Sequence, residues 1–175
     1  MFARLFSAGA EKKNAYALYQ ALVNQARSIG FYTEMNVPDT IEGRFDMILL
    51  HLSIVDLRLE KEGEKFVRLR RFIQEAMVSD MDRSFRELGI GDMSVGKEMK
   101  KVGAALLGRK AVYKAAITSD EQQVALQDAV LKNIYQSEDN SGISKMISYI
   151  VEAVLRLDAQ KLEMPSACTI EFPSA

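Results

Sequence analysis

The sequence contains few of the residues that most often build metal or redox sites. It has one cysteine, Cys168, one histidine, His51, and no tryptophan. A single cysteine excludes an internal disulfide and any multi-cysteine metal site, and a single histidine excludes a histidine-based zinc cluster. Because no other catalytic constellation is present, we expect neither a metal nor a cofactor.

Long hydrophobic runs are also missing. The longest, Met47–Leu59, is interrupted by His51, Asp56 and Arg58 and is too short and too charged to span a bilayer. The first apolar run, Met1–Phe6, is short and is cut off by the charged residues 11–13, which is not the pattern of a signal peptide, and no arginine-rich presequence is visible. These absences predict a cytoplasmic protein.

A strong charge of either sign is absent as well. The net charge is −1, so no whole-protein field attracts the chain to nucleic acid. Hydrophobic residues make up 48% and charged residues 27% of the 175 residues, which is typical of one soluble globular domain. We expect no specific nucleic-acid partner.

Hydrophobic periodicity predicts an all-α, single-domain bundle of about six helices. The expected helices cover about residues 14–29, 39–59, 64–88, 94–117, 119–136 and 143–157. The second is apolar around most of its circumference, so we expect it to be buried at the centre. Residues 1–13 are expected to form a flexible arm, residues 14–161 the single helical domain, and residues 162–175 a tail.

The stretch between the third and fourth helices resembles a phosphate-binding loop in spacing only. Residues 91–97 follow G-x-x-x-x-G-K, but Glu98 stands where the motif needs a Mg²⁺-binding hydroxyl, and a helix rather than a strand precedes it. We therefore expect no nucleotide binding. The residues instead predict a turn, with Gly89 ending one helix and Ser94 capping the next.

The predicted fourth helix is basic. Residues 97–114 contain six cations and one acid, whereas residues 119–175 contain four cations and nine acids, so the two segments are expected to neutralise each other in part. The first three cations, Lys97, Lys100 and Lys101, lie at the helix end where the dipole disfavours them. A solvated face and a surface for an anionic partner are both consistent with this pattern.

Two sequence runs together resemble the ubiquinol–cytochrome c chaperone family. The first is VPDTIEGRFD at residues 37–46, and the second is MDRSFRELGIGDMSVGK at residues 81–97. The resemblance spans about residues 16–155. It implies an all-helical, non-enzymatic assembly chaperone. Its partners would be newly made cytochrome b or an assembly intermediate of respiratory complex III, a small partner protein, and the inner membrane or the ribosome as a peripheral contact.

The candidate client-binding residues lie in or near these runs and on the basic helix. They are Tyr32, Asp39, Arg44, His51, Arg83, Asp92, Lys97, Lys100 and Lys101. Several also have a structural interpretation: Asp39 as a helix cap, Arg44 as the partner of an acid, and His51 as a hydrogen-bonded core residue rather than a haem ligand.

Three functions remain open from the residues alone. A chaperone requires an exposed apolar groove, expected beside the fourth helix, with basic residues on its rim. A small-ligand protein requires a deep closed pocket around His51, Tyr32, Arg44 and Asp46. An anionic-surface module, binding membrane or ribosome, would use the fourth helix, whose only aromatic residue, Tyr113, is insufficient for stacking on single-stranded bases.

Overall fold

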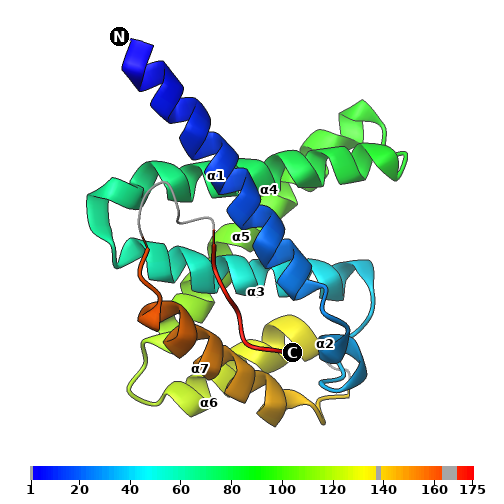
Figure 1. The fold of residues 1–175 in the computed structure, drawn as a ribbon. Coiled ribbons are helices and arrows are strands. Elements are labelled where there is room, and N and C mark those ends of the chain that lie inside the picture. The colour runs from blue at the N-terminus through cyan, green and yellow to red at the C-terminus, as the bar shows by residue number, and fades with distance from the viewer. Residues whose placement is uncertain (1, 137–138, 163–168) are drawn as a thin grey trace.

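The computed structural model describes residues 2–136, 139–162 and 169–175, and these form one bundle of helices without a strand (Figure 1). The elements are α1 (Phe2–Ala26), α2 (Ile29–Thr33), α3 (Ile41–Glu60), α4 (Val67–Glu87), α5 (Asp92–Ile117), α6 (Gln122–Val130) and α7 (Ile143–Ala159), with a 3₁₀ turn η1 (Gly63–Phe66) and a π-helical turn η2 (Leu131–Tyr135). The predicted all-α bundle is confirmed, with six long helices and the short α2.

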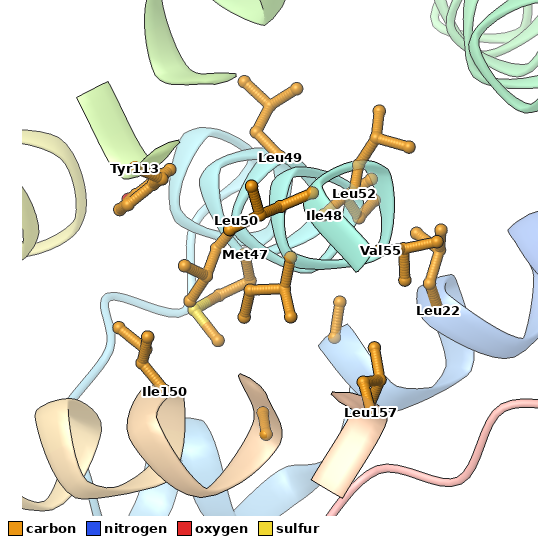
Figure 2. Close-up of a cluster of buried hydrophobic side chains, with 14 of the residues drawn as sticks. Leu22, Met47, Ile48, Leu49, Leu50, Leu52, Val55, Tyr113, Ile150 and Leu157 are labelled. Carbon is orange, nitrogen blue, oxygen red and sulfur yellow. The ribbon is translucent and has the colours of Figure 1, made fainter. Parts of the chain in front are cut away.

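Helix α3 is the centre of the bundle. Every residue from Asp46 to Leu59 is buried, and α3 packs against α1, α4, α5 and α7. Figure 2 shows its apolar side chains pointing outward in several directions, toward Leu22 of α1, Tyr113 of α5 and the α7 residues Ile150 and Leu157. The prediction of a buried central helix is therefore confirmed.

The start of α3 is fixed by its cap and by one glycine. The Thr40 side chain accepts a hydrogen bond from the Gly43 N–H at 3.0 Å, so Thr40 is the cap and the prediction that Asp39 fills this role is wrong. A Cβ atom at position 43 would lie 2.1 Å from the Pro38 carbonyl oxygen, which only glycine avoids. The proline, threonine and glycine of the first run therefore shape the turn into the core helix.

Several helix boundaries differ from the sequence prediction. Helix α1 begins at Phe2 rather than near Asn14, because the alanines, leucine, glutamate and lysines before position 14 are good helix formers; a flexible arm over 1–13 stays a prediction. Helix α5 begins at Asp92 with Gly91 as its cap position, so Ser94 lies inside the helix. The expected helix over 119–136 is divided into α6 and η2.

The local chemistry explains the late start of α6. The Ser119 hydroxyl accepts a hydrogen bond from the Glu121 N–H at 3.1 Å, two residues along the chain. Such a side-chain turn gives the backbone an alternative to the first helical turn, so the helix begins at Gln122. Helix α5, in contrast, runs unbroken through Gly103 and Gly108.

The cations of the second half of α5 form ion pairs with acids of α3. Arg109 contacts Asp46 at 3.1 Å, Lys110 contacts Asp56 at 2.9 Å, and Lys114 contacts Glu60 at 2.6 Å. The neutralising acids thus come from α3, not from residues 119–175 as expected from the sequence. The pKa of Asp56 lies below its usual value because hydrogen bonds from Arg70 and Lys110 outweigh the effect of burial.

No helix in the described ranges combines the length and the apolar character needed to cross a membrane.

Candidate binding groove

An open, mostly apolar groove of about 430 Å³ lies where the start of α3, the end of α4 and the first half of α5 meet. Its apolar lining is Ile41, Phe45, Ile48, Met81, Phe85, Leu88, Val102 and Ala105, and its charged lining is Arg27, Glu42, Arg44, Glu98 and Lys101. Ile41 is 66% exposed and Leu88 is 60% exposed, so the groove presents large apolar side chains to solvent. We call this surface the apolar groove.

The two sequence runs that carry the family resemblance both line the apolar groove. The first run supplies Ile41 and Phe45 from α3, and the second supplies Phe85 from α4 and Leu88 directly after it. Position 89 makes the arrangement possible, because Gly89 has a positive φ of 79° and ends α4 as predicted. The chain then turns at Gly91 and α5 packs back along α4.

Next to the apolar groove lies a smaller polar hollow of about 310 Å³. Its lining includes Arg27, Tyr32, Asp39 and Arg44, and it shares both arginines with the apolar groove. Arg44 donates to Asp39 at 2.6 Å, and its guanidinium lies 5.8 Å from the centre of the Tyr32 ring. The Arg44 hydrogen bond lowers the pKa of Asp39, and burial raises the pKa of Tyr32.

The remaining surface candidates are not gathered in one place. Lys101 lies on the rim of the apolar groove and contacts Glu98 at 2.8 Å. Lys97 and Lys100 are exposed outside the groove, and neither forms an ion pair within the described part of the chain. Arg83 pairs with Asp80, and Asp92 pairs with Arg86, each at 2.5 Å and outside the groove lining.

His51 is a fully buried core residue with two hydrogen bonds. Its Nδ1–H donates to the Met47 carbonyl oxygen at 2.8 Å, so its Nε2 accepts from the Tyr149 hydroxyl at 2.7 Å. Burial lowers its pKa from 6.5 to about 4, which keeps the ring neutral at pH 7. Phe31, Tyr149 and Phe172 surround the ring.

The four residues that would have to line one small-ligand pocket, His51, Tyr32, Arg44 and Asp46, lie in different places. His51 has no exposed surface, whereas Tyr32 and Arg44 line the polar hollow at the surface. Asp46 is buried beside Arg109 on α5, and burial raises its pKa in spite of that neighbour. These four residues therefore do not form the closed pocket that a small-ligand function requires.

Sequence reasoning did not identify the apolar lining of the groove or Arg27. Phe85 and Leu88 carry a helical hydrophobic period, which indicates burial and gives no sign of exposure at the helix end. Arg27 lies between α1 and α2, outside both sequence runs, and only the packing of α1 places it at the junction of the groove and the hollow. Its position had no signal in the sequence.

Comparison with known proteins relates the chain to one family. The family model described as ubiquinol-cytochrome C chaperone matches residues 33–164. A crystal structure of the Cbp3 homolog from Brucella abortus has 30% sequence identity and a TM-score of 0.85, and covers 99% of this chain and 97% of that one.

Animal relatives carry names of the same kind. Ubiquinol-cytochrome-c reductase complex assembly factor 1 from Xenopus laevis is 23% identical over 146 residues, which is 82% of this chain and 72% of that protein. The human protein of that name is 24% identical over 155 residues, or 85% of this chain and 50% of its own length, so the chain spans about half of the human relative. These names describe assembly factors and not enzymes, and with the family match they show that the chain belongs to the ubiquinol–cytochrome c chaperone family.

Proposed function

We propose that this chain is a non-enzymatic assembly chaperone whose apolar groove holds newly made cytochrome b or an assembly intermediate of the ubiquinol–cytochrome c reductase complex. The observation that carries the proposal is the meeting of both family runs on one exposed apolar surface. We further propose that it works in the bacterial cytoplasm at the inner membrane, with a small partner protein or the ribosome as additional contacts.

The composition of the apolar groove fits a segment of a membrane protein. Covering Ile41 and Leu88 with an apolar partner removes their exposed surface from water, at about 25 cal/mol per Å². Arg27, Arg44 and Lys101 stand on the rim, where they can meet acidic residues that flank the apolar segment. An open groove of this size accommodates a short segment of the client and leaves the rest outside.

Replacing Ile41 and Leu88 together with Asp is expected to abolish client capture without unfolding the chain, because both side chains are largely exposed. Each contributes about 1.5–3 kcal/mol when buried by a partner, so recovery of crosslinked cytochrome b should fall at least about tenfold. In a strain lacking the gene, the wild-type chain should restore membrane b-type haem and reductase activity, and the double variant should not.

The matched control is Val124→Asp, which changes an apolar side chain of similar exposure, 58%, on α6 away from the groove. It should restore haem and activity like the wild type. A folded double variant that restores both would show that the client binds elsewhere. A deletion strain with normal haem spectra and normal reductase activity would contradict the proposed function itself.

The lysines at the start of α5 are expected to attach the chaperone to an anionic surface. Arg109, Lys110 and Lys114 pair with acids of α3, whereas Lys101 pairs with Glu98 of its own helix, and Lys97 and Lys100 have no ion pair in the described part of the chain. Changing all three to Glu should weaken sedimentation with anionic vesicles by about 1 kcal/mol per residue and reduce its salt dependence. Circular dichroism should stay helical, because glutamate is a good helix former and Lys97 and Lys100 are exposed.

The control changes Lys13, Lys65 and Lys145 to Glu, which alters the net charge equally on other elements. This control should bind vesicles nearly as well as the wild type. If both triple variants lose binding to the same extent, only the overall charge matters. If the α5 variant binds vesicles as well as the wild type and with the same salt dependence, Lys97, Lys100 and Lys101 form a solvated face that does not bind the membrane.

A further inference from the structure

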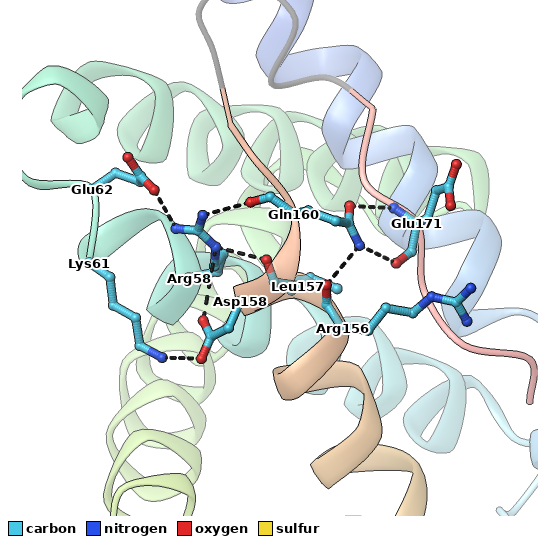
Figure 3. Close-up of polar contacts among 8 residues, drawn as sticks. All are labelled: Arg58, Lys61, Glu62, Arg156, Leu157, Asp158, Gln160 and Glu171. Atoms are coloured by element: carbon cyan, nitrogen blue, oxygen red, sulfur yellow. Dashed lines mark hydrogen bonds and ion pairs between the residues drawn. The ribbon is translucent and has the colours of Figure 1, made fainter.

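The tail segment, residues 169–175, is held through its backbone by glutamine side chains. The Gln160 amide makes two hydrogen bonds to Glu171, accepting from its N–H at 3.0 Å and donating to its carbonyl oxygen at 2.7 Å (Figure 3). Gln25 of α1 donates to the Pro173 carbonyl oxygen at 2.8 Å. These hydrogen bonds involve only backbone groups of the tail segment, so segments of many sequences can form them.

The side chains of residues 170–172 alternate in the manner of an extended strand. Ile170 and Phe172 point into the molecule, where Ile170 is 8% exposed and Phe172 packs edge-on against His51 with ring centres 5.2 Å apart. Glu171 between them is exposed, and Pro173 is buried. The site therefore selects an aliphatic residue, any residue, an aromatic residue and a proline.

The walls of this site belong to the helical bundle. They are Gln25 on α1, Gly30 on α2, His51 on α3 and Gln160 just after α7. Helix α3 contacts α1 and α7 directly. The backbone at Ala175 comes so close to α2 that a Cβ atom at Gly30 would lie 2.7 Å from the Ala175 carbonyl oxygen.

We propose that these walls form a peptide-binding site, in which an extended segment of a partner protein with the aliphatic–any–aromatic–proline pattern replaces the chain's own tail segment. In the isolated chain the tail segment fills the site at a high effective concentration, because it is part of the same molecule. A partner segment binds when the tail segment is released. This site is separate from the apolar groove and does not rest on the function proposed for that groove.

The test uses the full chain carrying Phe172→Ala, which removes the aromatic anchor of the tail segment and leaves every wall residue in place. The probe is a labelled, terminally blocked peptide with the sequence of residues 169–175, TIEFPSA. It should bind the variant at least tenfold more tightly than the wild-type chain, whose site is occupied. A control peptide carrying Phe172→Ala should bind neither chain. Adding Gln160→Ala to the Phe172→Ala chain should weaken binding of the TIEFPSA peptide several-fold.

A second chain, with residues 169–175 deleted, is measured in parallel. Binding of the TIEFPSA peptide to this chain, or a rise in its melting temperature with peptide, supports the proposal. If the Phe172→Ala chain keeps its melting temperature and binds no peptide at millimolar concentration, the proposal is overturned. It is also overturned if both altered chains are unfolded and the peptide refolds neither, because the tail segment is then an inseparable part of the core.

Discussion

Replacing His51 with Gln is expected to lower stability at pH 7 and to remove a large part of the chain's sensitivity to acid. At pH 7 the loss is about 1–3 kcal/mol, because hydrogen bonds to Met47 and Tyr149 are disturbed in the core. The ring has a pKa of about 4 in the folded chain and 6.5 in the unfolded one. As the pH falls below 6.5, the unfolded chain takes up the proton first, so the wild type loses stability until about pH 4.

The size of this loss follows from the shift of the pKa. Each unit is equivalent to about 1.4 kcal/mol, so the wild type should lose about 3 kcal/mol through His51 over this interval, and the Gln variant should lose none of it. The stability gap between the two should therefore close or reverse near pH 4.5. Urea unfolding at several pH values between 4.5 and 7 measures the gap directly.

The control is Tyr149→Phe, which removes the hydroxyl that donates to Nε2 but keeps a titrating histidine. It should be less stable at every pH and retain the acid dependence of the wild type. Acidic residues with lowered pKa values, such as Asp56, add to the acid loss equally in all three chains. A gap between wild type and the Gln variant that stays constant with pH would show that His51 is not held neutral by burial.

Replacing Arg58 with Ala is expected to be the most destabilising of these changes. The side chain is 8% exposed and joins the end of α3 to the end of α7 (Figure 3). Its Nε donates to the Leu157 carbonyl oxygen at 2.8 Å, and its Nη2 donates to the Gln160 carbonyl oxygen at 2.9 Å. Removing it leaves these two carbonyl oxygens without their donor and Glu62 with Lys65 as a partner, at a cost of about 1–3 kcal/mol per carbonyl in the free energy of unfolding.

The neighbouring Lys61 provides the matched control. It contacts Asp158 at 2.5 Å but is 47% exposed, so Lys61→Ala should cost no more than about 1 kcal/mol. Arg58→Lys keeps the charge but cannot present three separate N–H groups in a fixed plane, so its stability should fall between the two. Chemical denaturation of the three variants gives the order. Equal losses for Arg58→Ala and Lys61→Ala would show that Arg58 contributes only a surface charge.

The helices were predictable where a long apolar period is uninterrupted. Helix α3 is the best case, because its apolar residues lie all around the helix and predicted burial on every side. Prediction failed where a local side-chain bond competes with the helix, as at Ser119, and where weak preferences add up over many residues, as in the first half of α1.

The candidate site was predictable only in part, because it depends on how three helices pack. The two family runs both line the apolar groove, and an apolar groove with basic residues on its rim was expected beside the helix that is now α5. The sequence cannot tell which acids face which cations, so Arg109 was grouped with the free lysines although it pairs with Asp46. The contact between Gln160 and Glu171 involves the backbone of Glu171, so the residue types do not predict that the two positions meet.

The position of α3 at the centre has a consequence for how the chain is made. His51 bonds to a residue 98 positions later, and Arg58 to one 99 positions later, both on α7. A ribosome adds about 5–20 residues per second, so α3 emerges roughly 5–20 s before the helix that covers this face. During that interval the central helix, whose residues from Asp46 to Leu59 are all buried in the folded chain, lacks part of its cover. A protein that we propose protects another unfinished chain is thus itself vulnerable to proteases and to aggregation until α7 leaves the ribosome.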